Sequence, residues 1–267
     1  AAAEIRKLTI REMAAAGYGH IGGSMSICEV LAVLYEGVLR IDPQRPDWEE
    51  RDWLVLSKGH TGPALYAALA YKGYFDKALL GTLNQGGTRL PSHCDRLKTP
   101  GIDLSTGSLG QGLPMAMGMA MAARMDGKAH RVYCIIGDGE CDEGAVWETA
   151  LIANQYKLDN FIVTVDFNKI QSITSVEKTI ALEPLDQKWA SFGWHVIRVD
   201  GHDHAALHRA YDEARAALGG GKPIVVIADT VKGKGVSFME NDVLWHYRTA
   251  RGAEYDAAVK ELEAQKP

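Results

Sequence analysis

Short apolar runs along the chain alternate with longer segments in which apolar residues recur at helical spacing. A run that is apolar throughout is typical of a strand buried on both faces of a sheet, and helical segments between such strands are typical of βαβ units. We expect strands at residues 53–56, 132–136, 161–165, 194–199 and 223–228. The pattern therefore predicts a doubly wound α/β fold with a parallel sheet flanked by helices. No repeat or low-complexity linker interrupts it, so we expect a single domain over residues 1–267.

The helical segments have recognisable ends. The first stops at Gly17, and Asp203 is placed to cap a later helix, which we prefer to a metal cluster with the nearby His202, His204 and His208. A stripe of methionines on the helix after residue 112 is interpreted as core packing. We expect helices at residues 4–16, 25–39, 63–72, 76–83, 114–124, 143–156, 185–192, 204–218 and 253–264, and a polar loop at 171–183.

Charge and composition limit the possible partners. The formal net charge is −5 and neither acids nor bases form a long run, so we expect no nucleic acid and no polybasic membrane contact. No apolar stretch reaches the ~20 residues that span a bilayer, and no signal-peptide layout is present. The four cysteines lack metal-ligand or redox-pair spacing, so we expect free thiols in a reducing cytoplasm. The first residue is Ala1 rather than Met, which indicates trimming or an incomplete N-terminus.

Candidate chemistry is concentrated where two expected strands end. The strand at 132–136 leads to Gly137-Asp138-Gly139, and the strand at 161–165 leads to Asn168. Ligands of open α/β sheets bind at the carboxyl ends of the strands, so the acid and the amide should lie close together. Their oxygens suit a small hard cation such as Mg²⁺, which commonly shares its ligands with phosphate groups. The two glycines allow a diphosphate to approach the backbone.

Three histidines stand in loops: His20 between glycines, His60 after the strand at 53–56, and His93 after a proline. Each by itself would be interpreted as a solvated turn residue. A glycine-rich loop at 105–112 precedes a helix, whose unpaired N–H groups favour a phosphate. Its glycine order and the lack of a preceding strand argue against a nicotinamide-cofactor fingerprint, and residues 219–223 do not form a P-loop.

Together these motifs resemble those of thiamin diphosphate enzymes, and of transketolases in particular. Gly-Asp-Gly followed by Asn about thirty residues later resembles the thiamin diphosphate signature, which implies metal ligands at Asp138, Asn168 and the backbone carbonyl of Ile170. The metal would be Mg²⁺, for which Ca²⁺ or Mn²⁺ can substitute. The loop at 105–112 is similar to Thr-Gly-Pro-Leu-Gly-Gln-Gly of transketolases, with Ser108 where Pro is usual. Residues 182–185, 192–196 and 200–203 are similar to the N-terminal subunits of split transketolases.

The resemblance also implies roles for single residues. His20, His93 and His246 would face the sugar, where histidine suits proton transfer because its unperturbed pKa of ~6.5 is near working pH. The family usually has Gly after the last of these, and Tyr247 departs from that. Cofactor contacts are implied for His60, Gly107, Leu109, Gly137, Asp138, Gly139, Asn168 and His246.

Two acidic residues carry a separate expectation. Glu143 and Glu148 stand near the start of a helix, where carboxylates favour the positive end of the dipole. In transketolases, acids at these positions lie at the subunit interface and are linked to the cofactor site of a neighbour. The resemblance therefore implies that these two glutamates serve catalysis and assembly.

The implied activity is transfer of a two-carbon ketol unit from a ketose (phosphate) donor to an aldose (phosphate) acceptor. The pyrimidine-binding domain would come from a separate C-terminal subunit, and two copies of each subunit would form an α2β2 heterotetramer. One alternative is the diphosphate-binding subunit of another thiamin enzyme, of the 2-oxo acid dehydrogenase or deoxyxylulose-phosphate synthase type. Another is a non-catalytic nucleotide- or thiamin-binding module. Whether the sugar is a pentose phosphate or a specialised ketose is left open.

Overall fold

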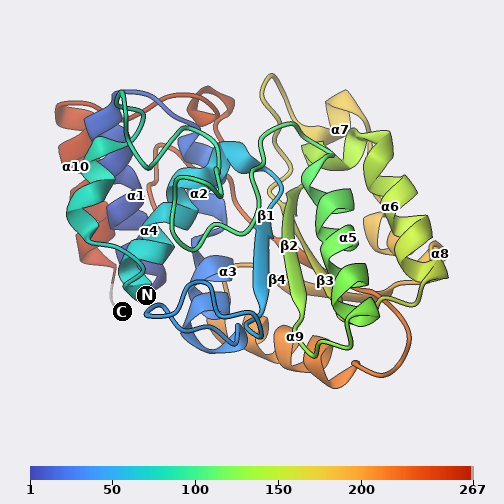
Figure 1. Cartoon of the computed structure of the whole chain (residues 1–267). Coiled ribbons are helices and arrows are strands. Elements are labelled where there is room, and N and C mark those ends of the chain that lie inside the picture. The colour runs from blue at the N-terminus through green and yellow to red at the C-terminus, as the bar shows by residue number, and fades with distance from the viewer. Residues whose placement is uncertain (266–267) are drawn as a thin grey trace.

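A five-stranded sheet forms the centre of the computed structural model, which describes residues 1–265 (Figure 1). The last two residues of the expected domain, 266 and 267, lie outside the described residues. The strands are β1 (Trp53–Leu56), β2 (Val132–Gly137), β3 (Phe161–Phe167), β4 (His195–Asp200) and β5 (Ile224–Asp229). Their order is β1-β2-β3-β5-β4, and every neighbouring pair is parallel. The predicted α/β fold with a parallel sheet is confirmed, and each strand begins within one residue of its expected start.

The apolar strands are covered on both faces. All six residues of β2 are buried, and they alternate between two hydrophobic cores. Val132, Cys134 and Ile136 point into one core, whereas Tyr133 and Ile135 point into the other. This is why the run is apolar throughout instead of alternating with polar residues.

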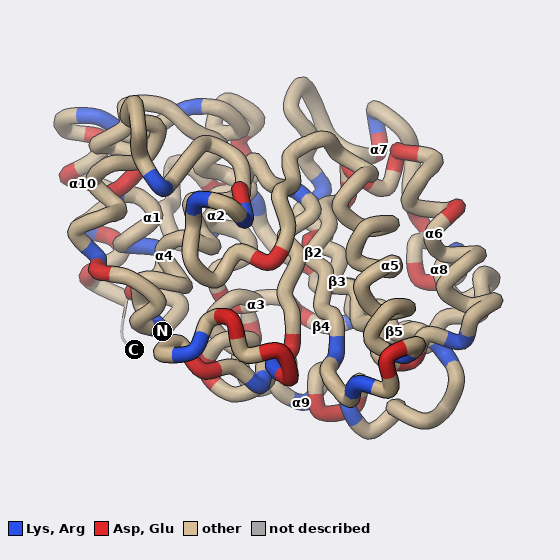
Figure 2. The backbone as a smooth tube through the Cα atoms, viewed as in Figure 1, with Lys and Arg blue, Asp and Glu red and all other residues tan. Residues whose placement is uncertain are grey.

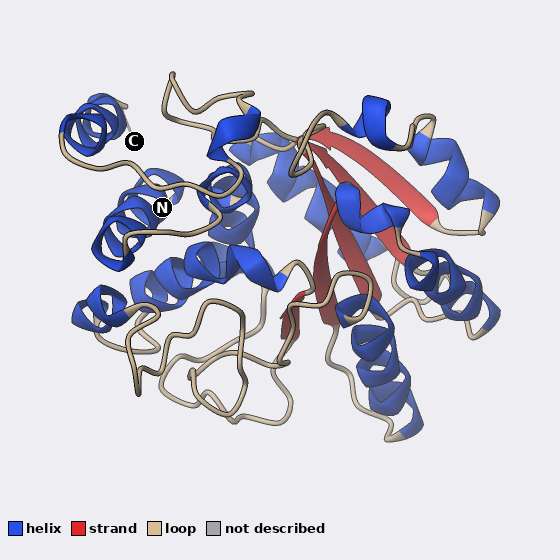
Figure 3. Ribbon diagram, turned by 90° about the horizontal axis from the view of Figure 1, so that it is seen from above, coloured by secondary structure: helices blue, strands red, loops and turns tan. Residues whose placement is uncertain are grey.

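Helices form a layer on each side of the sheet (Figure 3). One core contains α5 (Gly112–Met125), α6 (Gly144–Gln155) and α8 (Leu185–Ser191). The other contains α1 (Ala2–Ala16), α4 (Gly62–Lys72), α9 (His204–Ala216) and α10 (Ala253–Ala264). The chain passes from β3 to the far edge at β4 and then returns to β5, so a right-handed crossover places α9 on the face opposite α6 and α8.

The helix expected at 25–39 is wrong in its bounds and its continuity. The chain forms α2 (Ile21–Ser26), α3 (Cys28–Val33) and a π-helical turn, η1 (Leu34–Val38). Ile27 leaves helical geometry with φ −98° and ψ 6°. Beside this break, the Ser26 hydroxyl donates to Asp166 at 2.7 Å. A tertiary hydrogen bond thus accompanies an interruption that the periodicity does not show.

Two further segments differ from expectation. The helix expected at 76–83 is a 3-10 helix, η3 (Lys77–Thr82), and the loop expected at 171–183 contains a short helix, α7 (Val176–Thr179). Capping side chains explain both starts, since Asp76 accepts from the Ala78 N–H and Ser175 accepts from the Lys178 N–H. The remaining short 3-10 helices are η2 (Gly59–Thr61), η4 (Gly139–Asp142) and η5 (Val243–Trp245).

The expectation that the methionines of α5 pack in the core holds in part, because Met117, Met119 and Met121 pack against it from partly buried positions. The buried residues of this helix are small or lie near its start: Gly112, Leu113, Ala116, Ala120 and Ala123. Met115 and Met125 are exposed, and the methionines between them are half-buried. The alanines allow α5 to approach the sheet closely, so three methionines flank this contact and only Met115 and Met125 face outward. Among the described residues no helix is long and apolar enough to cross a membrane.

Candidate functional site

A cavity of about 290 Å³ lies at the carboxyl ends of β1, β2 and β3. The structure brings most of the predicted site residues together in its lining: His20, His60, His93, Gly107, Leu109, Gly137, Asp138, Gly139, Asn168, Ile170 and His246. The lining residues that lie farthest apart in the sequence, His20 and His246, are separated by more than two hundred residues. The sheet edge, rather than any one loop, therefore assembles the site.

Asp138 follows β2 directly and is 3% exposed. One carboxylate oxygen accepts from the Gly139 N–H at 2.7 Å and the other from the Lys169 N–H at 2.5 Å. Burial, with the nearby charge of Asp166, raises its pKa to about 7. It makes no ion pair with any residue that the structure describes, so a buried carboxylate faces the cavity without a counter-charge.

Asn168 and Ile170 complete this corner of the cavity. The Asn168 side chain donates through Nδ2 to Asp166 at 3.0 Å, which leaves Oδ1 as its acceptor, and Oδ1 accepts from the Ile170 N–H at 3.2 Å. The Ile170 carbonyl accepts from Lys232 Nζ at 2.8 Å. A carboxylate, an amide oxygen and a backbone carbonyl therefore share one corner, which is a donor set that suits a hard cation.

Lys232 is the opposite case, a buried cation. It is 2% exposed, and its ammonium donates to the Ile170 carbonyl, to the Gln171 carbonyl at 3.3 Å and to His246 Nδ1 at 2.8 Å. Burial lowers its pKa to about 8. Among the described residues it has no carboxylate partner at ion-pair distance. A buried ammonium and the buried carboxylate of Asp138 therefore line the same cavity without being paired to each other.

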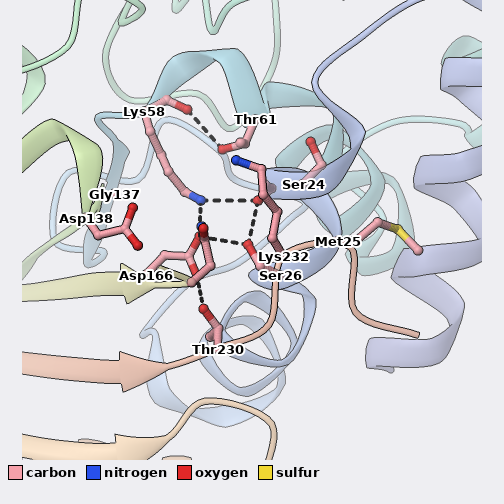
Figure 4. Close-up of polar contacts among 12 residues, drawn as sticks. Ser24, Met25, Ser26, Lys58, Thr61, Gly137, Asp138, Asp166, Thr230 and Lys232 are labelled. Carbon is pink, nitrogen blue, oxygen red and sulfur yellow. Dashed lines mark hydrogen bonds and ion pairs between the residues drawn. The ribbon is translucent and has the colours of Figure 1, made fainter. Parts of the chain in front are cut away.

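A second lysine of the cavity lining, Lys58, is held in a closed network of polar contacts (Figure 4). Lys58, 2% exposed, pairs with Asp166 at 2.5 Å and donates to the Gly23 carbonyl at 3.1 Å. Asp166 is fully buried and also accepts from Ser26 and Thr230. Although burial alone would raise the pKa of Asp166, the charge of Lys58 and these hydrogen bonds hold it below its usual value. This network fixes the strand end from which Asn168 projects.

The four histidines of the cavity gather around His20. Its ring centroid lies 4.9 Å from that of His60, 5.3 Å from that of His246 and 6.4 Å from that of His93. Gly107 leaves room for the His93 ring, because a Cβ at this position would lie 2.8 Å from Cδ2 of His93. The Tyr247 ring packs edge-on against His20 with centroids 4.6 Å apart.

Burial keeps these histidines neutral. It lowers the pKa of His20 to about 4, with His93 and Lys232 adding to the effect, and the pKa of His246 to about 3, with Lys232 adding to it. The pKa values of His60 and His93 also fall because of burial. The expectation of histidines poised near neutral pH is therefore replaced by a cluster that is uncharged at pH 7. Each ring then offers one N–H donor and one acceptor nitrogen.

Glu143 and Glu148 lie outside this cavity. Glu143 is the N-cap residue of α6, where a carboxylate favours the positive end of the dipole even without a side-chain capping bond. Glu148 lies beyond the first turn, so the dipole does not explain it. Both are exposed. A buried glutamate nearby was not predicted: Glu140 accepts from Ser57, from the Gly110 N–H at 2.9 Å and from the Gly137 N–H at 3.2 Å. It ties the glycine-rich loop to the end of β2.

Other lining residues were also missed by sequence reasoning: Gly23, Lys58, Glu140, Gln171, Ser172 and Lys232. Lys58 follows β1 and Lys232 follows β5, so the rule that located Asp138 at a strand end applied to both. Outside the cavity, the prediction that Asp203 caps a helix is confirmed by its bond to the Ala206 N–H at 2.9 Å. His202 is held by hydrogen bonds with Glu29 and the Val231 N–H. The four cysteines are free and buried.

Known proteins share both this sequence and this architecture. A family model described as the thiamine diphosphate binding domain of transketolase matches residues 1–263. The chain is 52% identical to the 6-deoxy-6-sulfo-D-fructose transketolase subunit SqwG of Clostridium sp. (strain MSTE9), covering 98% of this chain and 94% of that protein. It is 40% identical to one of the subunits named for the apulose-4-phosphate transketolase of Actinobacillus succinogenes, covering 97% of this chain and 92% of that protein.

This chain has the same fold as one part of the solved transketolases, which are longer than it. Transketolase from Leishmania mexicana superposes with a TM-score of 0.92 and 32% identity, covering 98% of this chain and 40% of that one. The predicted resemblance to split transketolases is therefore confirmed, because relatives of matching length are named as subunits. The chain belongs to the transketolase family, where it corresponds to the N-terminal, thiamin diphosphate-binding subunit of a split transketolase.

Proposed function

We propose that this chain binds thiamin diphosphate through Mg²⁺ and, with a C-terminal partner subunit, transfers a two-carbon ketol unit from a ketose to an aldose. The observation that carries the proposal is the pair of unpaired buried charges in one cavity, the carboxylate of Asp138 and the ammonium of Lys232. A metal cation and a diphosphate would neutralise them together. The alternative thiamin enzymes and the non-catalytic module lack the support that the transketolase relatives give.

The residues in the cavity fit that cofactor. Asp138, Asn168 and the Ile170 carbonyl would hold the cation, and Ca²⁺ or Mn²⁺ could replace Mg²⁺ there. The backbone at Gly107, Leu109, Gly137 and Gly139, together with His60, would line the diphosphate and the ring attached to it. When bound, thiamin diphosphate supplies the electron sink for breaking and forming the carbon–carbon bond.

The chain itself would orient the sugar and move protons. His20, His93 and His246 are neutral, so each can accept a proton from a sugar hydroxyl or donate a hydrogen bond to it. Lys232 Nζ donates to His246 Nδ1, which leaves Nε2 of that ring as its N–H donor. Because several basic nitrogens surround His20, a proton taken at one ring can be passed to a neighbour.

Removing the metal ligand tests the cofactor assignment. Asp138→Ala should weaken Mg²⁺-dependent binding of thiamin diphosphate by at least tenfold in calorimetry, while the circular dichroism spectrum is retained. Asp126→Ala is the matched control, because that carboxylate is exposed at the end of α5 and does not line the cavity. Equal affinity in Asp138→Ala and wild type, or equal losses in both variants, would reject the assignment.

Removing a substrate histidine tests the second role. His20→Ala should lower kcat by about 10²–10⁴-fold and change cofactor affinity little, because the ring is expected to face the sugar. His195→Ala is the control, since this histidine is bound to Glu213 at 3.0 Å on the far edge of the sheet. A parallel loss of cofactor binding would move His20 to the diphosphate end.

We also propose that activity requires a partner chain with the pyrimidine-binding domain, so that residues 1–267 serve as the diphosphate-binding domain alone. This chain spans about 40% of solved transketolases, and its subunit-named relatives have nearly its own length. The purified chain should show no ketol transfer, and activity should appear when the C-terminal subunit is added. Full activity without a partner, with purity checked by mass spectrometry, would contradict this proposal.

The outer face of α5 and α6 supports pairing of two copies into an α2β2 heterotetramer. Figure 2 shows few charges along α5, and α5, α6 and the residue that ends α6 carry exposed apolar side chains: Met115 (42%), Met125 (81%), Leu151 (58%), Ile152 (41%) and Tyr156 (57%). Glu143 and Glu148 lie at the start of α6 and within it. An apolar area with a few acids suits a second copy of this chain across a twofold axis.

The assembly is tested by charge insertion. Leu151→Arg should halve the mass of the reconstituted complex in sedimentation experiments, from α2β2 to αβ. Tyr71→Arg is the control, because Tyr71 is 36% exposed and lies on α4, in the helix layer on the other side of the sheet. If Leu151→Arg instead releases the partner chain, or leaves the mass unchanged, this face is not where the two copies meet.

We expect the donor to be a ketose with an anionic group at its far end. Two relatives of nearly this chain's length are named for 6-deoxy-6-sulfo-D-fructose and for apulose 4-phosphate, and both sugars end in such a group. A sulfonated ketose is our first choice. A cytoplasmic location is also expected, because four free, buried cysteines are typical of a reducing compartment.

A further inference from the structure

A second cavity, of about 400 Å³, lies beside the histidine cluster and is not used by the cofactor residues. We call it the arginine cavity. Its lining comes from two segments: Gly17, Tyr18, Tyr247, Arg248, Thr249, Arg251 and Glu254. The lining contains two guanidinium groups and one carboxylate, so its formal net charge is +1. The chemistry of this cavity therefore differs from that of the neutral histidines beside it.

The arginine cavity adjoins the site where the reaction is proposed to occur. Each of its two segments lies next to a histidine of the first cavity in the chain, since His20 is two residues after Tyr18 and His246 directly precedes Tyr247. The backbones of His20 and Arg248 form a parallel bridge, and the Tyr247 ring packs on His20. Arg248 is two residues past His246, which places the two backbones within about 7 Å of each other. A molecule held by the histidines can therefore extend toward Arg248.

Arg248 is held in a defined position but keeps donors available. Its guanidinium lies 4.4 Å from the centroid of the Trp245 ring, and Nη2 donates to Glu254 at 2.5 Å. That is its only side-chain hydrogen bond among the described residues, so the other N–H groups are available to a ligand. Its side chain is 43% exposed, which lets a ligand reach it. The planar guanidinium can bind two oxygens of one anion at once.

Two further groups fit an anion in this cavity. Arg251 donates through Nη2 to the Gly17 carbonyl, which fixes its guanidinium at the cavity wall. Thr249 is 6% exposed, and its hydroxyl is buried with no hydrogen-bond partner in the described chain. Unpaired buried hydroxyls are uncommon in folded proteins, and a ligand oxygen is one way to satisfy this one.

We propose that the arginine cavity is the subsite for the terminal anionic group of the sugar donor, a sulfonate or a phosphate, and that Arg248 is its main ligand. This inference rests on the proposed two-carbon transfer. The carbonyl end of the ketose lies among His20, His93 and His246, and the three-oxygen anion at the other end lies against Arg248, Arg251 and Thr249. The charge of the sugar is then recognised by this chain, in addition to any contacts from its partner.

The test compares donors on the reconstituted two-subunit enzyme. Arg248→Ala should raise KM about 10- to 100-fold for a ketose with a terminal sulfonate or phosphate, because a charge-assisted pair is lost. KM for the uncharged ketose of the same length should change less than about twofold, and thiamin diphosphate affinity should be unchanged. Arg248→Lys should recover part of the loss, since it restores the charge without the planar fork.

Arg45→Ala is a matched control. Arg45 also stacks on a tryptophan, with 5.0 Å to the Trp48 centroid, and also pairs with a nearby acid, Asp42 at 2.7 Å, but it lines neither cavity. The Arg45→Ala variant should have the same KM as wild type for every sugar donor. Equal KM changes for charged and uncharged donors in Arg248→Ala, or the same effect in Arg45→Ala, would overturn the subsite. So would loss of partner binding in Arg248→Ala, because the arginine would then hold the other chain.

Two further measurements distinguish a sulfonate from a phosphate ligand, and failure of the subsite from failure of the proposed function. A sulfonate has one negative charge at any pH, whereas a phosphate monoester gains a second near pH ~6. The sugar donor that binds in the arginine cavity should show the larger increase in KM in Arg248→Ala. Only for a phosphorylated donor should KM fall as the pH rises through about 6. If the wild-type complex transfers nothing from any ketose, the proposed function fails. Calorimetry with the sulfonated and phosphorylated ketoses then tests the subsite alone, and equal affinities of wild type and Arg248→Ala refute it.

Discussion

Asp166→Asn should destabilise the chain strongly, although it changes only one charge and almost no volume. Asp166 is fully buried and accepts hydrogen bonds from four groups: Lys58 Nζ at 2.5 Å, Ser26 Oγ at 2.7 Å, Asn168 Nδ2 at 3.0 Å and Thr230 Oγ1. The asparagine amide has one acceptor oxygen, and its NH₂ group would face donors. The buried ammonium of Lys58 would lose its counter-charge.

The magnitude follows from that unpaired ammonium. Removing one partner of a buried ion pair costs about 3–5 kcal/mol, whereas the neutral hydrogen bonds are worth roughly 1 kcal/mol each and are partly retained. We expect the free energy of unfolding to fall by about 4 kcal/mol, a large part of the 5–15 kcal/mol typical of a domain. Urea unfolding of the purified chain, followed by tryptophan fluorescence, measures this loss. Cofactor affinity should also fall, because Asp166 orients Asn168.

A matched substitution and a double variant test the reasoning. Asp229→Asn changes the same residue type at the same sheet edge, where Asp229 pairs with Arg198 at 2.8 Å and Lys169 at 3.2 Å but is partly exposed. It should cost at most about 1 kcal/mol. Replacing both partners, Lys58→Met with Asp166→Leu, should recover at least half of the Asp166→Asn loss. A loss below about 1 kcal/mol in Asp166→Asn, or one equal to that of Asp229→Asn, would refute the argument.

Two other perturbations probe the backbone and the acid stability. Gly59→Ala should lower both cofactor affinity and stability, measured by calorimetry and urea unfolding, because its Cβ would lie 2.7 Å from the backbone carbonyl atoms of Thr106. Burial alone would raise the pKa of Glu29, but the hydrogen bond from His202 and the charge of Arg6 lower it to about 2. The ionised Glu29 side chain therefore contributes fully to the free energy of unfolding above its ordinary pKa of 4.5. This contribution is lost as the pH falls through about 2. Over that range wild type should lose roughly 3 kcal/mol more than Glu29→Gln in urea titrations.

The chain offers a matched control substitution for Gly59→Ala and another for Glu29→Gln. Gly37→Ala would place a Cβ in open space and should leave cofactor affinity unchanged. Glu49→Gln changes a glutamate whose side chain is 84% exposed, and its pH profile should match wild type. Unaltered cofactor binding in Gly59→Ala would mean that the loop at Thr106 moves freely. Parallel acid profiles of wild type and Glu29→Gln would mean that Glu29 is not held by its neighbours.

The layers of the fold and the main corner of the site could be predicted from local sequence patterns. Strands buried on both faces must be apolar throughout, so the runs at 132–136 and 161–165 were recognisable without any tertiary information. Because parallel strands end at one edge, Asp138 and Asn168 could be placed together from their positions after those runs. The resemblance to transketolases supplied the roles of the histidines, which remain proposals, and the comparisons confirmed the family.

The pairing of charges and the orientation of helix faces depend on contacts that local sequence does not show. Lys58 and Asp166 are 108 residues apart, and no local pattern signals a salt bridge between two strand ends. The break at Ile27 accompanies the Ser26 bond to Asp166, and alanines rather than methionines fill the centre of the contact between α5 and the sheet. In each case the deciding contact is with a residue far along the chain. Periodicity describes one segment at a time, so it predicts which segments are helices and strands but not which partners their side chains meet.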